Sequence, residues 1–378
     1  MRFINAILST ILLVCAAQAE QTAVWIGMSE PTHGEREGIY RATLDTKTGA
    51  LTQPKLAAEI GMSEFLALSP NGKRLYAACR LPNGDGGVAA YEISDDKRSL
   101  RLLNKVPTGG GQSCHVGVDR TGHCLFSAQY GGGNVAALPL DPDGKIVPSP
   151  TVIRHTGSGP NHERQEGPHP HFVGTDPDNH FLFVPDLGSD QIIIYKLDPQ
   201  KCGLTAHGAG HTPPGSGPRH LVVHPNGRFV YVVNELAITV TAFRFDPAAG
   251  TLTEIQTIES LPAKDKKLPS TAAEIYIHPS GKFLYASTRN DDTITAFAVD
   301  PETGRLTFVE REPIRGSHPR SFNLDPSGKW LLAAGRDSNT ISVFRIDQKT
   351  GRLVFNDQIV NTPSPISIVM QPEPAHSN

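Results

Sequence analysis

The stretch GPRHLVVHPNGRFVYVVNE, residues 217–235, predicts a β-hairpin. Two β-rich runs, Leu221–Val223 and Phe229–Val233, flank the turn segment His-Pro-Asn-Gly. Because paired strands of a hairpin are antiparallel, Arg219 and Glu235 are expected to lie near each other at the end opposite the turn. These opposite charges either form a surface ion pair or face something that requires both.

The hairpin recurs along the chain, which indicates a repeat architecture. The copies are LSPNGKRLYAAC from Leu68, VDRTGHCLFSAQ from Val118, TDPDNHFLFVPD from Thr175, VHPNGRFVYVVN from Val223, IHPSGKFLYAST from Ile277 and LDPSGKWLLAAG from Leu324, with a seventh start, MQPE, at Met370. Their third residues are Pro70, Arg120, Pro177, Pro225, Pro279, Pro326 and Pro372, so the intervals between them are 50, 57, 48, 54, 47 and 46 residues. These seven residues serve below as anchors for comparing the repeats.

A second turn motif keeps step with the hairpins. It reads DTKTGALT at Asp45, DPAAGTLT at Asp246, DPETGRLT at Asp300 and DQKTGRLV at Asp347, with weaker copies at Asp95, Asp141 and Asp198. Each repeat therefore holds four short strands and no helix, which is typical of a β-propeller blade. We predict an all-β, seven-bladed β-propeller with four antiparallel strands per blade, in which the N-terminal strands close the C-terminal blade. An open sandwich would not explain seven matched intervals.

The first 19 residues have the pattern of a secretory signal peptide. Arg2 precedes an apolar run from Ile4 to Val14, and Ala17-Gln18-Ala19 fits a cleavage site before Glu20. The alternative, a membrane anchor, is disfavoured because the run is too short to span well. We therefore expect residues 20–378 to form a single propeller domain in a periplasmic or secreted protein, with no membrane association after cleavage.

Charge and cysteine content exclude other classes. The net charge is −3 and no basic run occurs, so nucleic acid is not an expected partner. The cysteines outside the leader are Cys79, Cys114, Cys124 and Cys202, whose spacing fits neither a disulfide framework nor a zinc motif. A disulfide is possible in an oxidising compartment, but most of these cysteines are expected to be buried small apolar residues.

Matched positions of the repeat predict a cluster of polar residues at one mouth of the central channel. Six residues before the anchors stand Glu64, Cys114, His171, Arg219, Ala273, Arg320 and Ile366. Eight residues beyond the hairpin glycine, at the far ends of the second strands, stand Arg80, Tyr130, Glu235, Arg289 and Arg336, with Leu187 by alignment. Hairpin geometry brings both sets to the same face, so Arg219, Glu235, Arg289, Arg320 and Arg336 are expected to converge.

Two histidines join this cluster. His169 and His171 lie in GPHPHF and share strand parity, whereas His115 and Glu274 are expected to point to the other side of their strands. Cations around a carboxylate, with histidines beside them, are typical of an anion-binding site that contains a base. The alternative is a solvated rim of ion pairs.

Three long segments resemble the seven-bladed lactonases of the 6-phosphogluconolactonase type, which are related to fungal-type muconate cycloisomerases. The segments are GSGPRHLVVHP followed by VVNEL, TAAEIYIHPSGKFLYASTRNDDTITAF, and HPRSFNLDPSGKWLLAAGRDSNTISVF. The resemblance covers essentially the whole mature chain. It implies an active site at His169 or His171, Arg219, Glu235 and Arg289, with Arg320 beside them, and chemistry without a metal or other cofactor. Export argues against a phosphorylated substrate.

The expected reaction is hydrolysis of an aldonolactone by a monomer. Glu235, His169 or His171 would activate water, Arg289 and Arg219 would stabilise the oxyanion, and Arg219, Arg320 and Arg336 would hold the substrate. No nucleophile elbow of the type G-x-S-x-G occurs. The alternatives are a lactonizing cycloisomerase, a non-catalytic binding propeller, and a metal lactonase with His169, His171 and Glu235 as ligands, which adjacent arginines disfavour.

Overall fold

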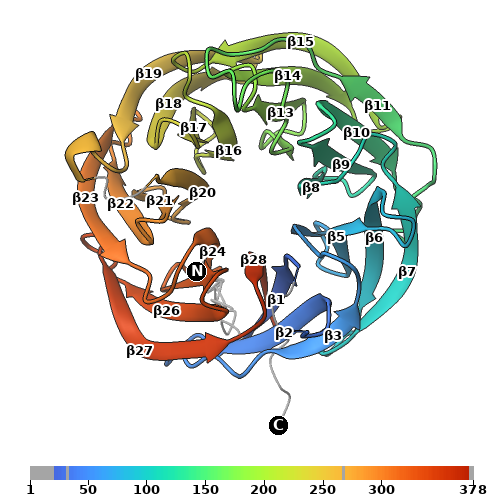
Figure 1. The fold of residues 1–378 in the computed structure, drawn as a ribbon, viewed down its shortest axis with the longest axis horizontal. Helices are drawn as coiled ribbons and strands as arrows, with labels where there is room; N and C mark the ends of the chain where they lie inside the picture. Colours follow the sequence, from blue (N-terminus) through green and yellow to red (C-terminus); the bar gives the residue numbers. More distant parts are fainter. Residues whose placement is uncertain (1–20, 31–33, 266–268, 374–378) are drawn as a thin grey trace, which may run out of the picture.

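The computed structural model describes residues 21–30, 34–265 and 269–373, so the predicted signal peptide lies outside the described residues. Seven four-stranded antiparallel sheets form a ring around a central channel (Figure 1). The described residues contain no α-helix, and their single helical turn is the 3₁₀ segment η1 (Ala263–Asp265). The predicted seven-bladed β-propeller is confirmed.

Each blade runs from an inner strand at the channel to an outer strand at the rim (Figure 1). The first three complete blades along the chain are β4 (Leu66–Leu68), β5 (Arg74–Arg80), β6 (Gly86–Ile93) and β7 (Leu100–Pro107); β8 (His115–Val118), β9 (Cys124–Gln129), β10 (Asn134–Pro139) and β11 (Thr151–Arg154); and β12 (Gly174–Thr175), β13 (Phe181–Asp186), β14 (Gln191–Asp198) and β15 (Gly203–His211). The next three are β16 (Pro218–Val223), β17 (Phe229–Asn234), β18 (Thr239–Asp246) and β19 (Thr251–Glu259); β20 (Thr271–Ile277), β21 (Phe283–Arg289), β22 (Thr293–Val299) and β23 (Leu306–Pro313); and β24 (Pro319–Leu324), β25 (Trp330–Gly335), β26 (Thr340–Ile346) and β27 (Leu353–Asn361).

The seventh blade joins the two ends of the described chain. Its order is β28 (Pro365–Pro372), β1 (Gln21–Met28), β2 (Gly38–Asp45) and β3 (Lys55–Glu59), so the inner strand comes from the C-terminal side. Strand β1 pairs with β28 from Thr22 opposite Pro372 to Met28 opposite Pro365. This confirms the predicted closure, and Figure 1 shows β28 and β1 side by side at the bottom of the ring.

The hydrophobic core lies between neighbouring blades. One cluster joins Tyr231 and Val240 of one blade to Leu284 and Phe297 of the next. Across the closing blade, buried Trp330 packs with Val24 and donates its indole N–H to the carbonyl of Thr46 at 2.9 Å. Each blade therefore depends on both neighbours, as in other circular repeats.

The hairpin that opens the sequence forms as expected from its turn chemistry. Strand β16 pairs with β17, and Gly227 adopts a φ of 71°, which a residue with a side chain would adopt at a cost. The side chain of Asn226 accepts a hydrogen bond from the amide of Arg228 at 2.9 Å. The free thiols of Cys79, Cys114, Cys124 and Cys202 are buried, as predicted. No helix in the described ranges is long and apolar enough to cross a membrane.

Candidate active site

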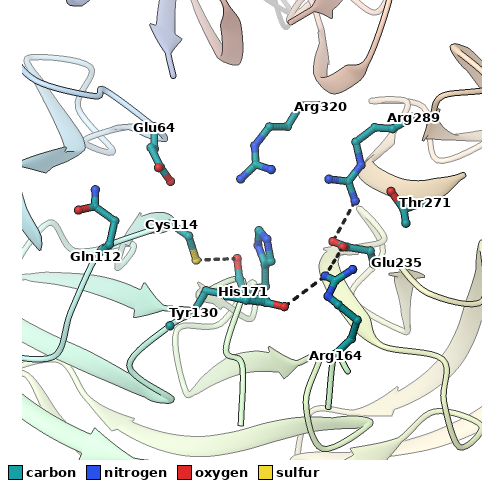
Figure 2. Close-up of a pocket in the computed structure, with 11 residues that line it drawn as sticks. Glu64, Gln112, Cys114, Tyr130, Arg164, His171, Glu235, Thr271, Arg289 and Arg320 are labelled. Atoms are coloured by element: carbon teal, nitrogen blue, oxygen red, sulfur yellow. Dashed lines mark hydrogen bonds and ion pairs between the residues drawn. The ribbon is translucent and has the colours of Figure 1, made fainter. Parts of the chain in front are cut away.

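A cavity of about 500 Å³ opens at one mouth of the central channel, and we call it the mouth cavity. Figure 2 shows the side chains that converge on it from several blades and from the long loop between β11 and β12. Its lining residues are Glu64, Gln112, Cys114, Tyr130, Gly131, Arg164, His171, Glu235, Thr271, Arg289 and Arg320. Three guanidinium groups therefore face two carboxylates in one partly enclosed space.

The inner strands are locally irregular next to the mouth cavity, and Arg320 of the cavity lining lies at one of these irregularities. The pairing register shifts at Arg219 in β16, at Ala273–Glu274 in β20 and at Arg320 in β24, one residue being inserted at each place. Such β-bulges interrupt the strict alternation of side chains and are common beside functional sites. Three consecutive blades thus carry a bulge at the same level of the channel, next to the mouth cavity.

Glu235, which directly follows β17, lies among three arginines. Its carboxylate oxygens lie 2.7 Å from Arg164 Nη2, 3.0 Å from Arg219 Nε and 3.0 Å from Arg289 Nη2. Burial alone would raise the pKa of Glu235, but these guanidinium groups lower it to about 2. The carboxylate is therefore ionised at any physiological pH and its lone pairs are occupied by cations.

Arg219 is not part of the cavity lining and is only 1% exposed. Its Nη1 donates to the backbone carbonyl of Ala273, and burial lowers its pKa to about 9, so it stays charged at neutral pH. A fully buried cation is stable only when paired. Glu235 supplies that pairing, which explains why the opening hairpin ends in opposite charges: they form one buried contact at the channel, not a surface pair.

His171 forms part of the cavity wall as a neutral imidazole. Burial, assisted by Arg219 and other neighbouring cations, holds its pKa well below the usual value, and its Nδ1 lacks a hydrogen-bond partner among the described residues. Its ring lies 5.2 Å from that of His220, which is bonded through Nδ1 to Glu274 at 2.8 Å. Burial also holds the pKa of His220 well below its usual value, so two buried neutral imidazoles lie side by side here.

A family model described as a lactonase, a 7-bladed beta-propeller, matches residues 23–370. The chain belongs to the seven-bladed β-propeller lactonase family. This lactonase is 38% identical over 295 residues to the 6-phosphogluconolactonase of Bacillus subtilis strain 168, a match that covers 78% of this chain and 83% of that protein. It is 36% identical over 294 residues to the 6-phosphogluconolactonase of Formosa agariphila, covering 76% and 82% of the two chains.

A solved structure agrees with this assignment. The periplasmic gluconolactonase PpgL of Pseudomonas aeruginosa superimposes with a TM-score of 0.87 at 30% sequence identity, covering 94% of this lactonase and 100% of that chain. The protein is a lactone-hydrolysing carboxylic ester hydrolase. Hydrolysis is thus favoured over the cycloisomerase and the non-catalytic alternatives.

Three residues predicted for the lactonase site are outside the cavity lining: Arg219, which pairs with Glu235, and His169 and Arg336. His169 stacks on Tyr130 with ring centroids 4.3 Å apart, and its Nε2 lies 3.1 Å from Glu166. Strand parity misplaced it because the chain is irregular before β12 and pairs there only through an isolated bridge at Pro170. Arg336 is outside the cavity lining and donates instead to neighbouring Asp337 at 2.6 Å.

The metal alternative is not supported by the geometry of its three proposed ligands. His169 is turned toward Glu166, whereas Glu235 is surrounded by guanidinium groups that would repel a cation. Within the described ranges, the group of three potential metal ligands whose ligand atoms all lie within 4.8 Å of one another is Asp176, Asp178 and His180, in the β12–β13 turn.

Arg164 is the main site residue that the sequence patterns missed. It belongs to the loop between β11 and β12, where its Nη2 also donates to the Tyr130 hydroxyl at 3.2 Å. Loop residues have no counterpart in the repeat. The sequence feature that pointed to this loop was the interval of 57 residues between Arg120 and Pro177. It is the longest of the six intervals and marks an insertion beside the site.

Proposed function

We propose that this lactonase opens a sugar δ-lactone in the mouth cavity. The observation that carries the proposal is the excess of guanidinium groups over carboxylates on the cavity wall, with Arg320 free of any hydrogen bond or ion pair to another described side chain. Lactone hydrolysis passes through a tetrahedral oxyanion, and preorganised cations in a partly buried site stabilise such a charge strongly. A free arginine fork is suited to receive it.

In the proposed reaction, a water molecule attacks the lactone carbonyl carbon and the ring C–O bond then breaks. Arg320 and Arg289 face the developing oxyanion. The neutral imidazole of His171 can both donate and accept a proton, so it is suited to contact the ring oxygen as that oxygen leaves. Arg219 acts as a buried charge that fixes Glu235.

We assign Glu235 a positioning role in place of the base role expected from the sequence. A carboxylate with a pKa of about 2 accepts a proton poorly near neutral pH, because general bases work best when their pKa lies near the working pH. Its contacts instead orient Arg164 and Arg289 at the cavity wall. Bonds of this kind keep guanidinium groups in place without reorganisation during the reaction.

The proposed substrate class is an aldonolactone, with or without a terminal phosphate. The names of the Bacillus and Formosa relatives favour the six-phosphate, whereas that of the Pseudomonas protein favours gluconolactone. The unpaired cation Arg320 suits either a hydroxylated ring or an added anion. We also propose that the chain is exported, because residues 1–19 have the pattern of a signal peptide. Export favours the unphosphorylated lactone as the natural substrate.

The test is ring opening of δ-gluconolactone and of its six-phosphate by the purified protein beginning at Glu20, followed in a pH-stat as acid release. We expect rates proportional to enzyme concentration and above spontaneous hydrolysis for both lactones. Addition of boiled protein is the control for buffer effects. Rates equal to the uncatalysed background for both substrates would contradict the proposed function.

A further inference from the structure

The mouth cavity contains a second carboxylate, that of Glu64, which the proposed reaction has not yet used. Glu64 lies just before β4, and its amide N–H donates to the carbonyl of Ala78 at 3.0 Å, which fixes the backbone there. Figure 2 shows the Glu64 carboxylate and the Arg320 guanidinium both pointing toward the middle of the cavity. The two come from different blades.

The surroundings of Glu64 differ from those of Glu235. No ion pair or side-chain hydrogen bond joins its carboxylate to another described residue, although the side chain is half-buried. Burial raises the pKa of Glu64, while Arg320, Arg219 and Arg80 oppose the rise and Glu30 adds to it. An unpaired carboxylate at a half-buried position lowers the stability of the fold, which points to a functional reason for the presence of Glu64.

The other proton acceptors on the cavity wall are less suited to activate water. Glu235 has a strongly lowered pKa and three cationic partners, and burial with nearby cations holds the pKa of His171 well below its usual value. Burial raises the pKa of the Cys114 thiol to about 12 and also raises the pKa of Tyr130, so both stay protonated. Glu64 is the remaining candidate proton acceptor among the lining residues.

We propose that Glu64 is the general base of this lactonase, accepting the proton of the attacking water. The assignment rests on the proposed function. As the water oxygen bonds to the carbonyl carbon, one water proton moves to the Glu64 carboxylate and the carbonyl electrons form the oxyanion. Collapse of the tetrahedral intermediate breaks the ring C–O bond, and the proton held by Glu64 passes to the leaving alkoxide. The products are the open hydroxy acid and regenerated Glu64.

The decisive variant is Glu64→Gln, which keeps the shape of the side chain and removes its basicity. We expect kcat for δ-gluconolactone to fall by roughly 10²–10⁴-fold with KM changed far less, because the base acts in the transition state. The matched control is Glu302→Gln, an exposed carboxylate on the outer part of another blade, which should leave kcat unchanged.

Two further readouts separate a base from a structural residue. In the wild type, kcat/KM should rise with pH through the pKa of Glu64, above the ordinary glutamate value of 4.5, because only the ionised form accepts a proton. This low-pH limb should be lost in Glu64→Gln. In Glu64→Ala, added formate should restore part of the rate by supplying an external carboxylate.

Suppose that the wild type hydrolyses lactones but Glu64→Gln keeps the wild-type kcat or an unchanged low-pH limb. This result would overturn the assignment of Glu64 and leave the proposed function standing. A wild type without any lactone turnover would overturn the proposed function and this assignment with it. If Glu64→Gln does not fold, as judged by its melting temperature, the formate response of Glu64→Ala decides: rescue supports the assignment, and a folded variant without rescue overturns it.

Discussion

A chain that ends at Ser364 is expected to lose the cooperative fold of the whole propeller. This truncation removes β28, the inner strand of the closing blade, and with it the buried side chains of Ile366 and Ile368. Each buried isoleucine contributes roughly 1.5–3 kcal/mol, and each backbone group of β1 left buried without a partner costs about 1–3 kcal/mol. These losses together approach the ~5–15 kcal/mol by which a typical domain is stable.

The measurement is thermal unfolding followed by circular dichroism. A chain that ends at Glu373 is the matched control, because it retains β28 together with the Glu373 carboxylate that pairs with Arg41. We expect the control to melt like the full chain and the Ser364 truncation to be unfolded or to melt far lower. Equal melting temperatures for the two truncations would contradict the closure of the ring by β28.

Glu235→Gln is expected to lower both stability and activity. The substitution removes the counter-charge of buried Arg219, and breaking a buried ion pair in this way costs roughly 3–5 kcal/mol. Arg289 and Arg164 lose the group that orients them, so kcat/KM should fall by roughly 10²–10³-fold, the usual effect of disturbing an oxyanion site. Chemical denaturation and steady-state kinetics measure the two effects.

The pH dependence distinguishes this role from proton transfer. The folded pKa of Glu235 is depressed, so its stabilising contribution is fully present above the ordinary value of 4.5 and is lost as pH falls toward about 2. Stability should therefore fall less steeply with acid in Glu235→Gln than in the wild type. The residual activity of the variant should keep the low-pH limb, since that limb is assigned to Glu64.

The control for Glu235→Gln is Glu59→Gln. Glu59 pairs with Arg36 on the exposed surface, where such a pair is worth about 0–1 kcal/mol. We expect no measurable change in activity for this variant. A Glu235→Gln protein as stable and active as Glu59→Gln would show that the three arginines do not depend on Glu235.

The repeat made the fold predictable because seven copies of one hairpin and one turn motif fix both the number of blades and the point of closure. The same register placed Glu64, Cys114, His171 and Arg320 at one mouth of the channel, since equivalent positions in a ring of blades lie at the same level. Hairpin geometry added Tyr130, Glu235 and Arg289. The repeat thus predicted most of the lining, although the same rule also predicted Arg336, which bonds to Asp337 outside the cavity lining.

Features outside the repeat could not be read in this way. Strand parity failed for His169 because the segment before β12 is not a regular strand, and the bulges at Arg219 and Arg320 leave no mark in the residue pattern. Arg164 comes from an insertion, so its contact with Glu235 was not foreseen. Glu235 was predicted to be a base, but three guanidinium groups lower its pKa to about 2, so we propose instead that it positions these arginines.

The most direct test of the central claim is a crystal structure of the protein with δ-gluconolactam, which has the shape of the lactone but an amide in place of the labile ester. We expect the lactam in the mouth cavity, with its carbonyl oxygen within hydrogen-bond distance of Arg289 or Arg320. The Glu64 carboxylate should face the carbonyl carbon directly or through one water molecule. A lactam bound outside the mouth cavity, or inside it with its carbonyl turned away from both arginines, would contradict the account.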